Sequence, residues 1–380
     1  MLRSRSPRLL IALAVVPFAG LMPHAAGAQT PSAGATPEVI ARGLDNPRGL
    51  AIGADGAIWV AEAGRGGRGP CVQGPEGGRV CVGATGALTR IVDGRKRRVL
   101  RGLPSIAERD GSAAAGPHDV SVRGGDQVWF TVDLAADPRR RSRLGPLGSR
   151  FAQLFRFTES GTARAQADIG AHEARRNPDQ DQPGSELDTN PTAVLAQASR
   201  RLVVDAGGNS LLSVDGRGRV STLATFAVRT VGAPGGTGPP AGTPIPMQAV
   251  PTSVAQDRRG ALYVSQLTGF PFPRGGARIY KVVPGSAPQV FAAGFTNVVD
   301  LAFGPDGSLY VLEITTNGLL SNNPAGALIR LLPNGSRQPV ATAGLTFPGG
   351  VTVADNGDLY VTNRAASARI GQVLRIRARG

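Results

Sequence analysis

Histidine is scarce in this sequence, which restricts the chemistry that the chain can perform. Of three histidines, His24 lies in an apolar leader, so His118 and His172 remain. Two histidines exclude a zinc site built from three of them. No G-x-S-x-G turn, H-E-x-x-H helix or phosphate-binding loop is present. His118, in "GPHDV", is the candidate catalytic residue because imidazole transfers protons near neutral pH. The alternative is a structural histidine bonded to a carbonyl group.

Oxygen-bearing side chains recur at the ends of apolar runs such as "LYVLE". Four of them are candidate metal ligands: Glu62, Asp205, Glu313 and Asn363. Their oxygens suit Ca²⁺ or Mg²⁺. The alternative, which we favour, is that they accept hydrogen bonds from turn N–H groups and hold no metal. Four further polar side chains at the starts or ends of such runs are candidate ligand contacts: Arg48, Asp119, Gln266 and Asp300.

Two loops contain further candidates. Asp179, Asp181 and Glu186 lie in the acidic segment 177–191, but their spacing lacks the central Gly and final Glu of an EF-hand. We therefore predict a solvated loop there. Phe270 and Phe272 lie among prolines, and either contact a hydrophobic ligand or pack onto the fold below.

Cys71 and Cys81 are the only cysteines, and both lie in one Gly-rich segment. A close pair in an exported chain predicts a disulfide. A metal site would need two more soft ligands, and the sequence has none nearby.

One hairpin is repeated six times, and its copies position all these residues. In each copy an apolar run, a polar turn and a second apolar run follow one another; the copies begin at Asn46, Gly116, Asn190, Val250, Asn297 and Phe347. The turns often end in Gly, as in "ADG" and "PDG", which supplies the positive φ of a tight hairpin. A second strand pair follows each hairpin. This pattern predicts an all-β fold, a six-bladed β-propeller of four-stranded antiparallel blades, with no helix outside the leader.

The two ends of the chain are predicted to meet in the last blade. The final repeat has only three strands, and "TPEVIARGLDNP" near the N-terminus matches the fourth strands of other repeats. We predict one domain, 29–380, with blades at approximately 46–103, 116–169, 190–226, 250–295, 297–345, and 347–380 plus 37–45. Inner strands line a central channel, so the candidate residues gather on the face where first strands begin and second strands end.

The first residues read as a signal peptide. Arg3, Arg5 and Arg8 precede the apolar run 9–22, and "AGA" offers a cleavage site, so we predict a leader of residues 1–28. The run is short and interrupted by Pro17, and no other apolar run could span a membrane. We expect a secreted or periplasmic protein without a transmembrane segment after cleavage; the alternative is an uncleaved anchor.

The net charge is +15, or 15 − 3 = +12 without the three leader arginines. The basic runs "GRKRR" and "DPRRRSR" lack interleaved aromatic residues, so we predict solvated loops and no nucleic-acid partner.

The repeats resemble known propeller families. "LVVDAGGNSL" is similar to NHL repeats, and the chain resembles the ScyD/ScyE family along nearly all of its mature length, including "DNPRGLAIGADGAIWVAEAG" and the Cys-bearing segment. Thr192 and Ala193 depart from this pattern, where an aromatic residue is expected after Pro191. The resemblance assigns no catalytic residue. The resemblance to SMP-30-like gluconolactonases implies a divalent ion near the channel. Streptogramin lyases have a "PHG" motif similar to "PHD" at His118, and the His of that motif is a general base.

We predict a binding or scaffold module with its ligand face at the channel mouth. The alternative is a metal-assisted hydrolase or lyase of the gluconolactonase/streptogramin-lyase type, using His118 for proton transfer. A quinoprotein dehydrogenase is a weaker third, because histidines are too few. The expected partner is a small molecule or a protein at the channel face, and the expected state is a monomer.

Overall fold

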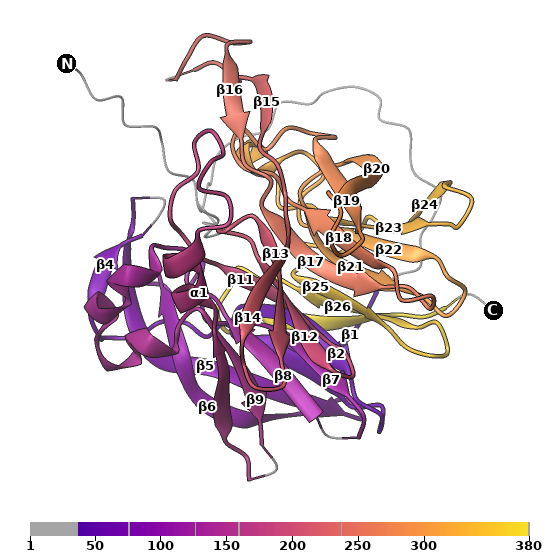
Figure 1. Cartoon of the computed structure of the whole chain (residues 1–380). Coiled ribbons are helices and arrows are strands. Elements are labelled where there is room, and N and C mark those ends of the chain that lie inside the picture. The colour runs from indigo at the N-terminus through magenta and orange to yellow at the C-terminus, as the bar shows by residue number, and fades with distance from the viewer. Residues whose placement is uncertain (1–36, 75–76, 126, 159, 237, 379–380) are drawn as a thin grey trace, which may run out of the picture.

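The computed structural model describes residues 37–378, apart from 75–76, 126, 159 and 237. The predicted signal peptide lies outside the described residues. Six antiparallel sheets surround a central axis, which confirms the predicted six-bladed β-propeller (Figure 1). Each inner strand contacts the inner strands on both sides, and the last returns to the first.

The first three blades, from inner to outer strand, are as follows. Blade 1 contains β2 (Pro47–Ile52), β3 (Ile58–Glu62), β5 (Arg79–Val92) and β6 (Arg95–Ala107), and short β4 (Cys71–Gln73) also pairs with β5. Blade 2 contains β7 (Pro117–Arg123), β8 (Gln127–Val132), β9 (Gln153–Phe157) and β10 (Ala163–Asp168). Blade 3 contains β11 (Pro191–Ala196), β12 (Arg200–Asp205), β13 (Ser210–Asp215) and β14 (Val220–Thr225).

The other three blades complete the ring. Blade 4 contains β17 (Pro251–Gln256), β18 (Leu262–Gln266), β19 (Ala277–Val282) and β20 (Gln289–Phe295). Blade 5 contains β21 (Val298–Phe303), β22 (Leu309–Glu313), β23 (Ala327–Leu331) and β24 (Arg337–Ala341). Blade 6 contains β25 (Gly350–Val353), β26 (Leu359–Asn363), β27 (Gly371–Ile376) and, as its outer strand, β1 (Glu38–Leu44).

Strand β1 closes the ring, as predicted. It pairs antiparallel with β27, with Glu38 opposite Arg375 and Leu44 opposite Gly371. Ala41 and Leu44 pack with Val60 of blade 1, so β1 also contributes to the interface between the last and first blades. The ring therefore depends on both ends of the described chain.

Apolar side chains fill all six interfaces between neighbouring blades. Val203 and Leu212 face blade 2, for example, whereas Leu202 and Leu211 of the same strands face blade 4. Because both faces of each sheet are covered, runs such as "LYVLE" are buried at every residue instead of alternating. The predicted tight turns are present, with φ of +75° at Gly56 and +80° at Gly307.

Insertions between blades are the main departure from a plain repeat. A helix, α1 (Ile169–Arg176), follows β10, contrary to the prediction of no helix outside the leader; Asp168 caps it by accepting from the N–H of Ala171 at 2.7 Å. Eight residues are too few for a clear helical period. Two 3₁₀ segments, η1 (Pro138–Arg150) and η2 (Leu319–Ser321), lie in other loops.

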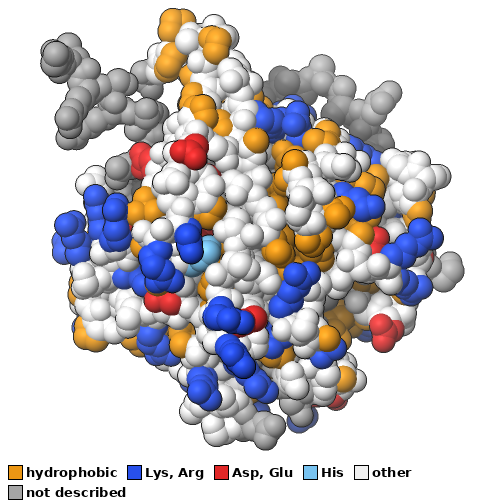
Figure 2. All heavy atoms as spheres, viewed as in Figure 1, with side chains coloured by type: hydrophobic (Ala, Val, Ile, Leu, Met, Phe, Trp, Pro, Cys, Tyr) orange, Lys and Arg blue, Asp and Glu red, His pale blue; other side chains and the backbone are white. Residues whose placement is uncertain are grey.

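A hairpin of β15 (Arg229–Gly232) and β16 (Pro244–Met247) projects from the body between blades 3 and 4 (Figure 1). Hydrophobic side chains cover its end, and Lys and Arg side chains outnumber acidic ones on the visible face (Figure 2). No helix among the described residues is long and apolar enough to cross a membrane.

The predicted disulfide between Cys71 and Cys81 is present, with an S–S distance of 2.01 Å. Cys71 lies directly opposite Cys81 where β4 pairs with β5. The bond therefore ties β4 to the first residues of the long strand β5.

Candidate functional site

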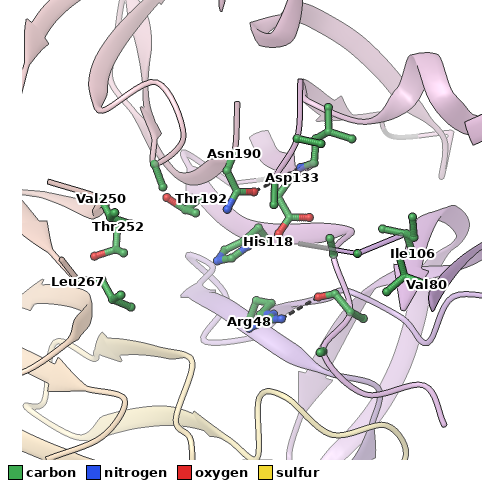
Figure 3. A pocket seen from close by; sticks show the side chains of 18 of the residues that line it. Arg48, Val80, Ile106, His118, Asp133, Asn190, Thr192, Val250, Thr252 and Leu267 are labelled. Carbon is green, nitrogen blue, oxygen red and sulfur yellow. Dashed lines mark hydrogen bonds and ion pairs between the residues drawn. The ribbon is translucent and has the colours of Figure 1, made fainter. Parts of the chain in front are cut away.

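A hollow of about 120 Å³ opens at the mouth of the channel, with room for about four water molecules at about 30 Å³ each (Figure 3). All six blades line it, five through the second residue of the inner strand and blade 6 through the residue before β25. These residues are Arg48, His118, Thr192, Thr252, Val299 and Gly349. The predicted face therefore carries a cavity.

His118 is oriented by a carboxylate. Its Nδ1 lies 2.7 Å from Asp133 Oδ2, and Asp133 also accepts a hydrogen bond from the N–H of Gly116. The opposite edge of the ring, which carries Nε2, faces the hollow (Figure 3). This fixed ring, with one nitrogen held by an acid and the other free, is an arrangement that can transfer a proton.

Arg48 and Thr192 bring buried donors without partners to the same wall. Arg48 is 7% exposed and donates from Nη2 to the carbonyl of Ala114 at 2.7 Å, but its Nε has no hydrogen-bond partner among the described residues. The hydroxyl of Thr192, which is also 7% exposed, has none either. Burial lowers the pKa of Arg48, and the charge of Asp133 opposes that effect.

The remaining walls are apolar. Leu267, Val299 and Ile314 line the hollow and pack in one apolar cluster with Phe272. Phe272 is 3% exposed, so it packs onto the blade below and does not contact solvent. Across the hollow, β4 and β5 contribute Val72 and Val80, beside the disulfide. Polar side chains of the inner strands thus face the hollow from blades 1–4, and apolar side chains close it on two sides, at Leu267 and at Val80.

The structure does not gather the four predicted metal ligands at one point. Each instead accepts a hydrogen bond from a backbone N–H at or just before the first strand of its own blade. The acceptor–donor pairs are Glu62 with Asp45 at 2.7 Å, Asp205 with Asn190 at 2.6 Å, Glu313 with Thr296 at 2.7 Å, and Asn363 with Thr346 at 2.7 Å. Within the described part of the chain, no three His, Cys, Asp or Glu side chains surround a point that could hold a metal ion. The four residues do not fit Ca²⁺ or Mg²⁺, and we derive no step through an ion at them.

The structure separates the predicted ligand contacts. Arg48 lines the hollow with His118, whereas Asp119 and Asp300 lie one residue further along their strands. Asp119 accepts from the N–H of Val194 at 2.8 Å, and Asp300 from that of Val351 at 2.7 Å, so each acid ties its blade to the next.

Burial raises the pKa values of both channel acids. The pKa of Asp300 rises to about 6, and the charge of Asp300 raises the pKa of Asp119 further. Gln266 is buried at the end of β18 beside Arg229 and does not line the hollow.

Asp133 is the functional residue that sequence reasoning missed. In the strand register, Val132 pairs with Pro117 as Glu62 pairs with Pro47, so the repeat points to Val132. Blade 2 has its acid one residue later, at Asp133. Asp133 still accepts a hydrogen bond from the backbone N–H of Gly116, just as the acids of the other blades accept one from a backbone N–H of their own blade. An acid directly after an inner hairpin is the signal that could have identified it.

Comparison with known proteins supports the fold only. No family model matches the chain, and no curated protein matches its sequence. An aldose sugar dehydrogenase with bound PQQ from Streptomyces coelicolor superposes with a TM-score of 0.52 at 13% identity, covering 91% of this chain and 99% of that chain.

Lyases and a calcium-binding protein are also among the structural neighbours. A virginiamycin B lyase from Staphylococcus aureus gives a TM-score of 0.44 at 14% identity, covering 87% of this chain and 84% of that chain. A calcium-binding regucalcin from Agrobacterium tumefaciens gives 0.49 at 12% identity, covering 90% and 93%. The ScyD/ScyE resemblance stays a prediction.

Proposed function

We propose that the chain is a binding protein of the ScyD/ScyE type, exported from the cytoplasm, that holds a small molecule at the channel mouth. The ligand has an apolar body and one group rich in oxygen acceptors, such as a carboxylate. The hollow, at about 120 Å³, is slightly smaller than a cavity of about 150 Å³ that takes benzene, so it encloses roughly one small ring or a short chain.

One observation carries this proposal: Arg48 Nε and Thr192 Oγ1 are both buried without partners in the wall of the hollow. Buried polar atoms almost always have a hydrogen-bond partner, and an unpaired one costs about 1–3 kcal/mol. A carboxylate between the two residues would accept from both. The apolar walls around Leu267 and Val80 would cover the rest of the molecule.

Calorimetric titration of the purified protein with benzoate and octanoate tests the proposal, with benzyl alcohol as a probe that lacks the acid. We expect the two acids to bind and the alcohol to bind at least tenfold more weakly. Arg48→Gln should weaken acid binding about 10- to 100-fold, as expected for a hydrogen bond to a charged group. Thr192→Val should weaken it less.

Thr352→Val, on β25 and outside the hollow, is the matched control and should bind like the wild type. Failure of both acids to bind, or equal binding by all variants, would overturn the proposal.

The second candidate function is proton transfer by His118, and the bond between its Nδ1 and Asp133 favours it. An imidazole held this way can remove a proton from a bound ligand or from a water that attacks a lactone. We derive this step without a metal ion. In a lactone-hydrolysis screen, His118→Ala and Asp133→Asn should abolish turnover while acid binding persists. If no lactone is turned over, or if His118→Ala turns over at the wild-type rate, this candidate fails.

A further inference from the structure

One row of side chains recurs across the blades, and blade 2 lacks the acid that balances its charge elsewhere. In four blades an aromatic residue of the second strand pairs with an arginine of the third: Trp59 with Arg90, Trp129 with Arg156, Tyr310 with Arg330, and Tyr360 with Arg375. In blades 1, 5 and 6 an aspartate between the first and second strands forms an ion pair with this arginine; the acids are Asp55, Asp306 and Asp358. Blade 2 is the exception within the described part of the chain.

The turn of the inner hairpin explains the exception. Gly125 stands four residues before the aromatic residue of blade 2, which is the place that Asp55 and Asp306 occupy in blades 1 and 5. Asp126 follows it and lies outside the described residues. Among the described residues, no Asp or Glu forms an ion pair with Arg156. The positive charge of this row is therefore unbalanced.

Three other arginines lie near Arg156. Arg164 of β10 is directly opposite it in the strand register, an arrangement of like charges that destabilises a sheet. From blade 3, the guanidinium of Arg201 stacks 4.1 Å from the centre of the Trp129 ring, and that of Arg156 lies 5.7 Å from the same ring. The charges of Arg156 and Arg123 both act on Arg201. Figure 2 shows Lys and Arg side chains gathered over β9 and β14, low in the view, with few acidic side chains among them.

Arg201 is held in place with one donor unused. Its Nη1 donates to the carbonyls of Gln197 at 2.8 Å and Arg200 at 3.0 Å, and the buried Trp129 ring supports its plane. Its Nε is buried and has no hydrogen-bond partner among the described residues. Burial and then the charges of the neighbouring arginines lower the pKa of Arg201. An anion between these groups would remove the repulsion and accept from the unused donor.

We propose that Arg156, Arg164 and Arg201 bind a phosphate-type oxyanion on the rim between blades 2 and 3. Guanidinium groups match phosphate oxygens with paired hydrogen bonds, and several cations balance an anion of more than one charge. Arg123 adds a fourth positive charge. This rim lies at the turn end of the inner hairpins, opposite the end that carries the hollow, so the site does not depend on the proposed function of the hollow.

Calorimetric titration of the purified full chain with sodium pyrophosphate tests the proposal. We expect one site per chain and an affinity that falls as salt is added. Arg156→Gln and Arg164→Gln should each weaken binding about tenfold, as expected for a hydrogen bond to a charged group. Arg97→Gln is the matched control, because this exposed arginine lies opposite Arg90 in blade 1, where Asp55 already balances the row.

Gly125→Asp is the sharpest variant, because it gives blade 2 the acid of blades 1 and 5. A Cβ at Gly125 would meet no atom within 4 Å, so the turn has room for it. The introduced carboxylate should pair with Arg156 and weaken pyrophosphate binding at least tenfold. Gly238→Asp is its control: it adds the same charge to the loop between β15 and β16, where a Cβ also meets no atom within 4 Å, and it should bind like the wild type.

A second probe separates a free phosphate from a lipid head group. Sedimentation with phosphatidylcholine vesicles that contain phosphatidic acid is compared with phosphatidylcholine alone. Pyrophosphate binding that Gly125→Asp weakens supports a site for a free phosphate. Binding only to the phosphatidic acid vesicles, weakened by the same variant, supports the same site for a head group.

Three results overturn the proposal. The first is that neither probe binds. The second is that Gly125→Asp binds like the wild type. The third is an equal loss in Gly125→Asp and Gly238→Asp, because binding would then reflect net charge alone.

Discussion

Replacement of Glu62 by Ala should destabilise the propeller where its first and last blades meet. The side chain is fully buried and accepts from the N–H of Asp45 at 2.7 Å and from Arg98 at 2.9 and 2.6 Å, as well as from the hydroxyl of Thr89. Asp45 follows directly after β1. The substitution therefore removes the acceptor that ties the closing strand to blade 1.

The expected loss follows from what remains unpaired. Breaking a buried ion pair costs about 3–5 kcal/mol. The lower end applies here, because Arg98 keeps about a quarter of its side chain exposed, at 26%, and retains Asp45 as a partner at 3.0 Å. We therefore expect a loss of about 3 kcal/mol, which corresponds to a fall in Tm of roughly 4 °C in a chain of this size.

Thermal unfolding followed by circular dichroism measures this loss. Asp55→Ala is the control, because the pair of Asp55 with Arg90 lies at the surface, where such pairs contribute less than about 1 kcal/mol. An unchanged Tm for Glu62→Ala, combined with loss of a bound metal ion, would refute the reasoning and make Glu62 a ligand instead of a cap.

Three further predictions concern the channel, the disulfide and the ring closure. Burial raises the pKa of Asp300 from 3.8 to about 6, so the folded state holds its proton longer and stability falls as pH rises from about 4 to about 6. Asp300→Asn should flatten that part of a plot of Tm against pH. Cys71→Ser with Cys81→Ser should remove up to about 3 kcal/mol and weaken benzoate binding, because the wall at Val72 and Val80 loses its crosslink. Deletion of residues 1–44 should leave β27 with an open edge and give aggregates in size-exclusion chromatography.

Each of these three has an outcome that would contradict it. An equal pH slope for Asp300→Asn and the wild type would mean that the channel acid is ionised throughout. Wild-type benzoate affinity in the double Cys variant would show that β4 keeps its place without the crosslink. A monomeric deletion variant with an unchanged Tm would mean that β1 is dispensable, and deletion of residues 1–36 alone serves as its control.

The sequence predicts the fold because one hairpin pattern recurs at every blade. Gly56 and Gly307 mark its turns, and the likeness of the β1 text to other outer strands predicts the closure. The same logic identifies Arg48 and His118, since equivalent positions of repeats must converge on one axis. Repetition is thus a reliable guide to position.

What each residue contacts at its position could not be read from the repeat. Glu62 has oxygens suited to a metal, but in the structure it binds Arg98. Arg98 belongs to the outer strand β6, and the hairpin pattern does not show that its long side chain reaches Glu62. Asp133 was missed because blade 2 shifts its acid by one residue. Asp179 is buried because α1 packs beside blade 3, and α1 itself lies in an insertion that has no counterpart in other repeats.

The closing strand also determines the order in which this protein can be completed. A ribosome makes β1 first, yet its partner β27 is made last, with Glu38 opposite Arg375. At about 5–20 residues per second, synthesis leaves the first strand unpaired for tens of seconds. Blades 1–5 each consist of strands that lie close together in the chain and can form without the C-terminal end, but the sixth cannot, so folding ends in a step that joins the first and last strands. Until that step, the unpaired backbone of β1 can form hydrogen bonds with strands of other molecules. A chaperone that holds the unfinished chain therefore matters more for this ring than for a fold that is completed from one end to the other.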